Sequence, residues 1–201
     1  MTLVLADDSI GMPPAAPPAR PRVLLIGTGF ALVGIVMAIA GMLGLYVEQR
    51  AQAVRSGHAW LPKGVVIDIT PGNVAMVGLV ISAVVVQWAV YSIAHDDRPR
   101  AYLALGLTVL LGAAYINGIA FAYTQMGITV HNPVGLLIFV ITGLHLAMAA
   151  AGMLFVGLMA FRALGGQYSG RDREGIVAAA IYWHVTVVVF AAIWFTIFVT
   201  K

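Results

Sequence analysis

The chain has 201 residues, of which 61% are hydrophobic and only 9% are charged. An ordinary soluble domain carries about 25% charged residues, so this composition indicates an integral membrane protein. The absence of cysteine excludes disulfides and cysteine metal sites, and the net charge of +3 comes with no basic stretch dense enough to predict nucleic-acid binding.

The chain begins with 21 residues rich in proline and alanine, which lack the ordered parts of a secretory signal. We expect this segment to be a flexible cytoplasmic tail. Five apolar runs follow, each long enough for the roughly 20 residues that a helix needs to cross a bilayer. They lack the alternation of barrel strands and therefore predict helices. The predicted fold is all-α, an integral membrane bundle of five transmembrane helices in one domain (22–201), at residues 22–48, 73–94, 101–127, 134–161 and 176–199.

Lysine and arginine in the flanks of the predicted helices indicate the orientation, because cytoplasmic loops carry an excess of these residues. One side would carry Arg20, Arg22, Arg98, Arg100, Arg162, Arg171 and Arg173. The other side would carry Arg50, Arg55, Lys63 and Lys201. The bias predicts a cytoplasmic N-terminus and an external C-terminus.

Acidic residues are confined to the tail, the loops and the helix ends. They are Asp7, Asp8, Glu48, Asp68, Asp96, Asp97, Asp172 and Glu174. Proton pumps, ion-coupled carriers and voltage sensors usually need an ionisable group within the membrane. The distribution therefore argues against these classes.

Two histidines, His145 and His184, fall inside predicted helices. A pair on neighbouring helices could ligate a haem, because imidazole is a good axial ligand. Either could instead relay protons, or form a structural hydrogen bond across a helix interface. Each lies in the first half of its helix, and the two helices run in opposite directions, so we expect the histidines at different depths.

Small and polar residues suggest how the helices pack. Ala40 with Gly44, and Ala114 with Gly118, are spaced four apart, which allows helix backbones to approach closely. The amide of Asn117 is expected to form an interhelical hydrogen bond, as is that of Gln87.

Several segments together resemble subunit III of the haem-copper cytochrome c oxidases in its short, five-helix bacterial form. "YWHVTVVVFAAIWFTIFV" is similar to the family's terminal helix, which begins Tyr-Trp-His, here Tyr182, Trp183 and His184. "TGLHLAMAAAG" is similar to its Thr-Gly-x-His stretch, which includes His145. "AGMLGLYVEQRAQ" resembles the end of its first helix, and "GHAWLP" its Trp-Pro loop through Trp60.

The chain departs from the family pattern at four positions within the predicted helices. The family usually carries glutamates where this chain has Ile35 and Ala122. A second histidine of the pattern is replaced by Met148, and an aspartate by Val187. These losses put in doubt any role in sustaining proton uptake by a catalytic subunit.

The resemblance implies a non-catalytic subunit of a respiratory terminal oxidase in a bacterial plasma membrane. Its implied partners are subunits I and II, which would hold the haem and copper, together with phospholipids and other subunits of the respiratory complex. We expect no catalytic, cofactor or metal site in this chain. Structural, lipid or subunit contacts are expected at His145, His184, Trp183, Tyr182, Trp60 and Asn117.

Alternative functions fit parts of the same pattern. The chain could be the subunit III-like partner of a nitric oxide reductase or of a quinol oxidase. From a different class, it could be a haem-bearing membrane anchor that uses His145 and His184. A small-molecule transporter would need a polar midplane site or broken helices in repeated halves, and neither is visible in the sequence.

Overall fold

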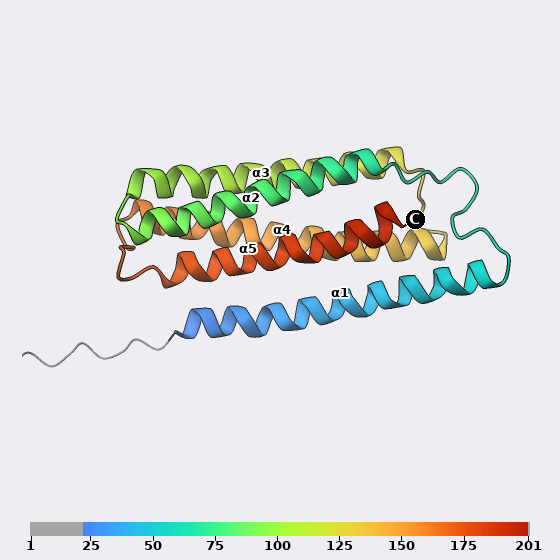
Figure 1. Ribbon diagram of the computed structural model, residues 1–201, viewed down its shortest axis with the longest axis horizontal. Helices are drawn as coiled ribbons and strands as arrows, with labels where there is room; N and C mark the ends of the chain where they lie inside the picture. The colour runs from blue at the N-terminus through green and yellow to red at the C-terminus, as the bar shows by residue number, and fades with distance from the viewer. Residues whose placement is uncertain (1–21, 201) are drawn as a thin grey trace, which may run out of the picture.

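A computed structural model describes residues 22–200 and confirms the predicted bundle of five helices (Figure 1). The predicted tail over residues 1–21 lies outside the described residues. All five helices are long and apolar enough to span a membrane, so the chain is a multi-pass membrane protein. The elements are α1 Val23–Arg55, α2 Ile69–Ala94, α3 Arg98–Gln125, α4 Pro133–Leu164, α5 Glu174–Ile193 and the π-helix η1 Trp194–Val199, which continues α5.

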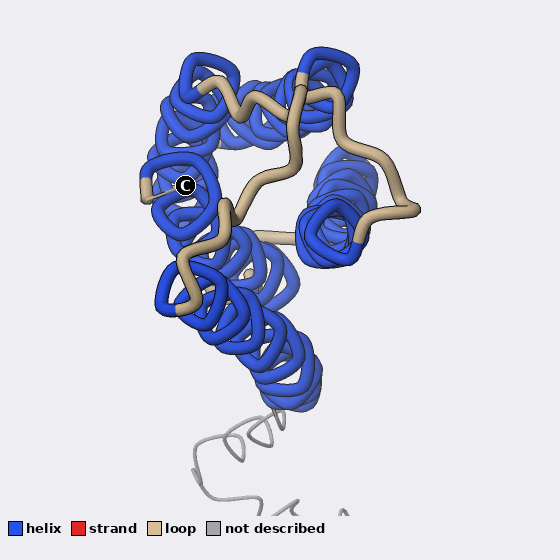
Figure 2. Tube along the Cα trace, turned by 90° about the vertical axis from the view of Figure 1, so that its right-hand side faces the viewer, coloured by secondary structure: helices blue, strands red, loops and turns tan. Residues whose placement is uncertain are grey.

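Helices α2 to α5 form a four-helix bundle, and α1 packs on its side. In the bundle α2 contacts α3 and α5, and α4 contacts the same two helices. Helix α1 packs against α5 and α4 only along one edge of this bundle (Figures 1 and 2). We call the end where α1 begins the N-terminal end of the bundle, which also holds the α2–α3 and α4–α5 connections. The opposite, C-terminal end holds the α1–α2 and α3–α4 connections and Thr200.

Side-chain caps fix where three of the helices begin. The carboxylate of Asp68 accepts a hydrogen bond from the backbone amide of Thr70 at 2.9 Å. Asn132 caps α4 in the same way through the amide of Val134 at 2.8 Å, and Asp97 caps α3. Such caps satisfy backbone N–H groups that the first turn of a helix leaves unpaired. The cap at Asp68 starts α2 four residues before the apolar run that predicted it.

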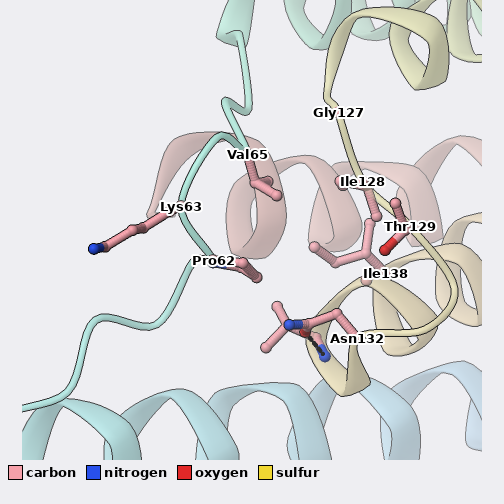
Figure 3. Close-up of a pocket in the computed structure, with 10 residues that line it drawn as sticks. Pro62, Lys63, Val65, Gly127, Ile128, Thr129, Asn132 and Ile138 are labelled. Carbon is pink, nitrogen blue, oxygen red and sulfur yellow. Dashed lines mark hydrogen bonds between the residues drawn. The ribbon is translucent and has the colours of Figure 1, made fainter.

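Two connections pack on each other at the C-terminal end of the bundle (Figure 3). The amide of Val66 donates to the carbonyl oxygen of Met126 at 3.2 Å. Gly127 has a φ of +61°, and a Cβ on it would lie 2.9 Å from the Gly64 carbonyl oxygen, so only glycine fits this crossing. Residues of both connections line a small pocket of about 180 Å³.

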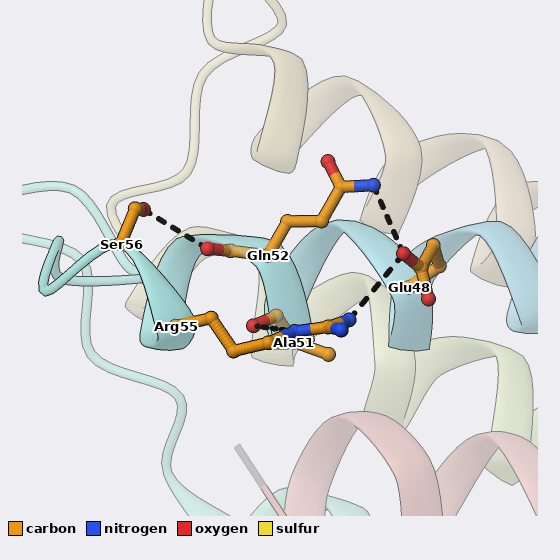
Figure 4. Close-up of polar contacts among 5 residues, drawn as sticks. All are labelled: Glu48, Ala51, Gln52, Arg55 and Ser56. Atoms are coloured by element: carbon orange, nitrogen blue, oxygen red, sulfur yellow. Dashed lines mark hydrogen bonds and ion pairs between the residues drawn. The ribbon is translucent and has the colours of Figure 1, made fainter.

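Helix α1 continues to Arg55, seven residues beyond the end predicted at residue 48. The extension consists of good helix formers, and its side chains bond along one face (Figure 4). The Glu48 carboxylate accepts from the Gln52 amide at 2.9 Å and pairs with the Arg55 guanidinium at 3.4 Å. The prediction followed hydrophobicity alone and therefore ended too early. At 1.5 Å per residue α1 is about 50 Å long, well beyond the roughly 30 Å of bilayer hydrocarbon.

Only a narrow stripe of α1 is buried in the bundle. Its buried residues are Thr28, Leu32, Ile39 and Tyr46, spaced by four and seven residues. This spacing brings the four side chains to one edge of the helix. The remaining surface is largely apolar and exposed, as at Phe30 and Met37. Helix α1 therefore offers most of its circumference to the surroundings.

Candidate functional site

His145 lies inside the bundle, where α3, α4 and α5 meet. Its side chain on α4 is fully buried. The Tyr115 hydroxyl of α3 lies 2.7 Å from Nδ1, and the Thr186 carbonyl oxygen of α5 lies 2.9 Å from Nε2. The Phe190 ring packs beside the imidazole, with the two centroids 5.4 Å apart. One side chain therefore connects three helices.

These hydrogen bonds limit the chemistry that His145 can perform. A carbonyl oxygen only accepts, so Nε2 carries the proton and Nδ1 accepts from the Tyr115 hydroxyl. Both nitrogens of the neutral ring are then engaged, and no lone pair remains for a haem iron. Within residues 22–200, no group of three or more His, Cys, Asp or Glu side chains is placed to hold a metal ion. The geometry fits a structural tie.

His184 lies on a different side of α5 from Thr186, the residue of α5 that His145 contacts. His145 bonds to Thr186, only two residues along α5 from His184, so the two histidines lie at similar depth. The expectation of different depths was wrong because α4 is much longer than the bilayer core, so position within it does not measure depth. Two residues turn a helix by about 200°, so His184 points away from His145. The histidines do not face a common group, and this geometry does not fit a shared haem.

His184 instead contacts α2 at the surface of the bundle. Its ring is half-buried, and Nε2 lies 3.1 Å from Oε1 of Gln87. Gln87 thus forms the interhelical hydrogen bond expected from the sequence. This contact ties α5 to α2 on the side of α5 away from His145.

Trp183 and Tyr182 fill space that glycines on facing helices leave open. The indole Nε1 of Trp183 donates to Ser82 Oγ on α2 at 2.8 Å, and the ring is fully buried. A Cβ on Gly112 of α3 would lie 2.7 Å from Trp183, and one on Gly152 of α4 would lie 2.9 Å from Tyr182. The two aromatic residues therefore contact all three other helices of the four-helix bundle.

The glycines that permit this packing are not those that the sequence pattern suggested. A Cβ on Gly44 or Gly118 would meet no atom within 4 Å, apart from its chain neighbours and the backbone of its own helix. Ala40 and Ala114 are exposed. The spacing of small residues identifies helices that can pack closely, but it does not show which glycine faces a large side chain. Only the position of Trp183 shows that Gly112 and Gly152 are the close contacts.

Trp60 holds the α1–α2 connection against α1. Its indole Nε1 donates to the hydroxyl of Tyr46 at 3.2 Å, and the two rings meet edge to face with centroids 5.2 Å apart. Tyr46 is fully buried on α1. This contact fixes how the connection leaves the end of α1.

Asn117 lies on the outward surface of α3. Its side chain is exposed and forms no hydrogen bond with any residue in the range 22–200. The interhelical hydrogen bond expected for this amide is therefore not made within the described part of the chain. The sequence could not show this, because a polar residue in an apolar helix has the same pattern whether it faces inward or outward.

Polar contacts at both ends attach α1 to the last helix, and sequence reasoning missed them. At the N-terminal end, the Glu174 carboxylate accepts from the backbone amide of Leu25 at 3.1 Å. At the C-terminal end, the Arg50 guanidinium donates to the side-chain and backbone oxygens of Thr200. The paired residues are about 150 positions apart, so no local pattern reveals them.

The connections at the N-terminal end of the bundle are also joined by hydrogen bonds. Asp96 has a φ of +57° and accepts from the Gly170 amide at 2.7 Å. Nearby, the Tyr168 hydroxyl donates to Met159 Sδ at 2.9 Å. Burial raises the pKa of Tyr168 above its ordinary value of 10.0, against the lowering effect of the Arg162 charge. The phenol therefore stays protonated at neutral pH and remains a donor.

A groove of about 580 Å³ runs along the outer surface between α3 and α4. Its lining side chains are apolar: Val109, Ile116, Ala150, Met153, Leu154, Gly157, Leu158 and Phe161. Arg162 follows Phe161 directly, and its exposed guanidinium stacks over the Tyr168 ring at 5.4 Å. The groove thus has a long apolar floor. Arg162 does not line it, and its Nε donates to Oε1 of Gln167 in the α4–α5 connection at 2.8 Å.

The four positions where the chain departs from the resembled pattern lie in apolar surroundings. Ala122, Met148 and Val187 are buried, and Ile35 packs partly against the core. An acid at any of the first three would be expensive there without a partner. The interior therefore has apolar contacts where the pattern would place ionisable groups.

Comparisons with known proteins agree on one family. The model of the family "Cytochrome c oxidase subunit III" matches residues 22–200. The chain is 27% identical to cytochrome c oxidase subunit 3 of Corynebacterium diphtheriae over 183 residues, which cover 89% of each chain. It is 36% identical to the protein of that name from Strongylocentrotus purpuratus over 152 residues, and 31% identical to that from Xenopus laevis over 157 residues.

The matched regions differ in their share of the relatives. They cover 72% and 76% of this chain but only 57% and 60% of the sea-urchin and frog proteins. The bacterial relative is matched over most of its length. The family match spans every described residue, so the chain belongs to the cytochrome c oxidase subunit III family in a five-helix form.

Proposed function

We propose that this chain is a non-catalytic subunit of a bacterial haem-copper terminal oxidase. Its partners would be subunits I and II, which would hold the haem and copper of the enzyme. It would lie in the plasma membrane with its N-terminus in the cytoplasm and its C-terminus outside. Its contribution would be to stabilise the assembled enzyme and to bind phospholipid at its surface.

The observation that carries this proposal is the use of the polar side chains inside the bundle. Both nitrogens of His145, the indole N–H of Trp183 and the hydroxyl of Tyr182 are engaged in hydrogen bonds between helices. Such contacts hold a bundle together in a membrane, where unpaired polar groups are costly. A rigid helical body with its histidine chemistry used internally suits a structural subunit.

The α3–α4 groove supports phospholipid binding. Its apolar lining is suited to an acyl chain, and its volume of about 580 Å³ exceeds that of a few methylene groups. Arg162 follows the lining residue Phe161 in sequence, and its two terminal nitrogens would donate to the phosphate of a lipid there, while its Nε donates to Gln167. The His184 ring and the Trp60 indole contact protein groups instead. We therefore place the lipid contact at the groove.

A substitution that fills the groove tests lipid binding. A Cβ on Gly157 would meet no atom within 4 Å, so Gly157→Leu should fill the groove without disturbing the helices. We expect native mass spectrometry to show the loss of a bound phospholipid from the purified complex. Gly78→Leu on α2, where a Cβ also meets no atom within 4 Å, is the matched control. Retention of all lipids in the Gly157 variant would remove the groove from the proposal.

Purification through a tag on this chain tests the wider proposal. From native membranes in a gentle detergent, we expect two large subunits and a haem absorption in the reduced-minus-oxidised spectrum. Deletion of the chain should lower the amount of assembled oxidase more than the turnover per haem. A chain recovered alone would contradict the proposal, and one recovered alone with its own haem would support the membrane-anchor alternative.

A further inference from the structure

A polar pair lies at membrane depth on the outward seam between α2 and α5. Gln87 is exposed on α2, and its Oε1 lies 3.1 Å from Nε2 of the half-buried His184 on α5. In Figure 1 these two helices lie toward the viewer, in front of α3 and α4. The pair therefore faces the surroundings of the bundle and not its core.

Both residues lie within the thickness of the hydrocarbon. Gln87 is about five residues from the midpoint of α2, and His184 about three residues from the midpoint of the α5–η1 helix. At 1.5 Å per residue, they lie about 8 Å and 4 Å from the helix midpoints. The half-thickness of the bilayer core is about 15 Å. Neither side chain sits at the level of the headgroups.

The contact between the two side chains leaves hydrogen-bonding groups unused. Oε1 of Gln87 accepts, so Nε2 of His184 donates and its Nδ1 remains an acceptor. The amide nitrogen of Gln87 keeps two N–H donors. Within residues 22–200 these groups form no other hydrogen bond. Lipid acyl chains offer neither donors nor acceptors, so an exposed amide at this depth is unfavourable in contact with lipid.

Apolar side chains flank the pair along both helices. On α2, Val80 and Val84 lie seven and three residues before Gln87, and Tyr91 lies four residues after it. All three are exposed. On α5, Ile181 and Val188 lie three residues before and four residues after His184 and are also exposed. Residues at these spacings share one face of a helix. At this depth the surface is therefore an apolar helical face around one polar pair. A second pair, Trp194 Nε1 donating to Asn73 Oδ1 at 2.9 Å, joins α2 to η1 near the start of α2.

We propose that this surface, the α2–α5 seam, is where a transmembrane helix of the catalytic subunit docks and presents a polar side chain to Gln87 and His184. The inference rests on the proposed function, which supplies that partner. A helix can bring both apolar contacts and a hydrogen-bonding group to this depth, whereas a lipid brings only the first. The α3–α4 groove differs in this respect, since its lining is apolar throughout.

Photo-crosslinking at matched exposed positions tests the docking surface. Val84 and Val188 on the seam are 67% and 68% exposed, and Leu110 on α3 and Leu154 on α4 are 65% and 76% exposed. We would replace each in turn with a photoreactive phenylalanine analogue in the full chain and irradiate native membranes. The seam positions should crosslink to the large subunit, with at least tenfold more product than Leu110 or Leu154.

A double substitution tests the polar pair itself. Gln87→Leu with His184→Leu should lower recovery of the large subunit about tenfold in a tag purification, because the partner's polar side chain loses its hydrogen bonds. The melting temperature of the isolated variant in detergent reports whether the chain still folds. Leu110→Ala with Leu154→Ala alters exposed apolar side chains on α3 and α4 and should leave recovery unchanged.

The outcomes separate this inference from the proposed function. If the unmodified chain recovers no large subunit, the proposed function fails and the inference fails with it. Recovery of the large subunit with crosslinks confined to Leu110 or Leu154, or with loss of binding only in the Leu110→Ala, Leu154→Ala variant, would overturn the seam while leaving the proposed function standing. Recovery without any crosslink from the seam would also overturn it.

Discussion

The hydrogen bonds of His145 illustrate how single residues stabilise this bundle. The imidazole joins α4 to a side chain of α3 and to the backbone of α5. In a membrane, helix association gains little from the hydrophobic effect, because lipid is as apolar as the helix surface. Interhelical hydrogen bonds and close packing therefore account for more of the stability than in a soluble bundle.

Removing the hydroxyl of Tyr115 should weaken the bundle measurably. We expect Tyr115→Phe to lower the free energy of unfolding by about 1 kcal/mol, because Nδ1 of His145 would lose its donor in a buried site. Denaturation of the purified chain in mixed micelles would measure the change. Tyr91→Phe, at an exposed tyrosine on α2, is the control. Equal stability of the two variants would argue against a structural role for the Tyr115–His145 contact.

Two of the three glycines of α3 allow a test of close packing. An alanine at Gly112 would place Cβ 2.7 Å from Trp183 and 2.8 Å from Met153, whereas one at Gly118 would meet nothing within 4 Å. We expect Gly112→Ala to lower the free energy of unfolding by about 1–3 kcal/mol through overpacking. Gly118→Ala should be neutral or slightly stabilising, because alanine favours helix. Thermal unfolding in one detergent compares them, and a reversed order would show that Trp183 moves aside easily.

Sequence reasoning found several of these residues but not their partners. His145 stood out because an ionisable group interrupts an apolar run, and Trp183, Tyr182 and Trp60 stood out through the family resemblance. Tyr115 and Gly112 did not, because tyrosine and glycine are frequent in membrane helices and their roles depend on what faces them. The choice among the readings of His145 required knowing that Tyr115 and Thr186 lie within hydrogen-bonding distance.

Helix α1 is attached to the rest of the molecule in a different way from the other helices. A narrow stripe of its side chains is buried, while polar contacts to the last helix close both ends. At its start the Glu174 carboxylate meets a backbone amide of the first turn, where negative charge is favourable. Most of the apolar surface of α1 remains available to lipid or to another subunit.

Breaking both end contacts should loosen α1. We expect the combination of Glu174→Ala and Arg50→Ala to broaden the distance between spin labels at Met37 of α1 and Leu110 of α3, both of which are exposed. The chain has no cysteine, so two introduced cysteines carry the labels without further changes. Glu48→Gln, which alters a contact within α1 alone, is the control. An unchanged distance distribution would show that the buried stripe suffices to hold α1.

The helix limits show which part of an element the sequence can predict. The apolar runs identified every helix, because about 20 apolar residues are needed to cross the bilayer. They did not identify the polar extension of α1 to Arg55 or the start of α2 at Ile69. Helix formation beyond the hydrocarbon depends on propensity and caps, and an apolar run does not report either.

For the whole molecule, the arginine bias predicts which end faces the cytoplasm. Single cysteines at His58, in the α1–α2 connection, and at Gln167, in the α4–α5 connection, lie at opposite ends of the bundle and are exposed. In spheroplasts, where the plasma membrane is intact but its outer face is accessible, a membrane-impermeant maleimide should label His58→Cys. It should label Gln167→Cys only after lysis. The reverse pattern would invert the orientation.

The sequence alone determined that this protein is a five-helix membrane bundle and that it resembles the subunit III family. The length of an apolar run must match the bilayer, and the family motifs keep their order along the chain. The helices and the family resemblance can therefore both be recognised from the sequence without the fold. The tertiary structure alone decided which polar groups meet. Pairs such as His145 with Tyr115, Leu25 with Glu174 and Gln87 with His184 join distant residues. The outward or inward direction of a side chain depends on how whole helices are rotated against one another, and this rotation is set by packing across the bundle.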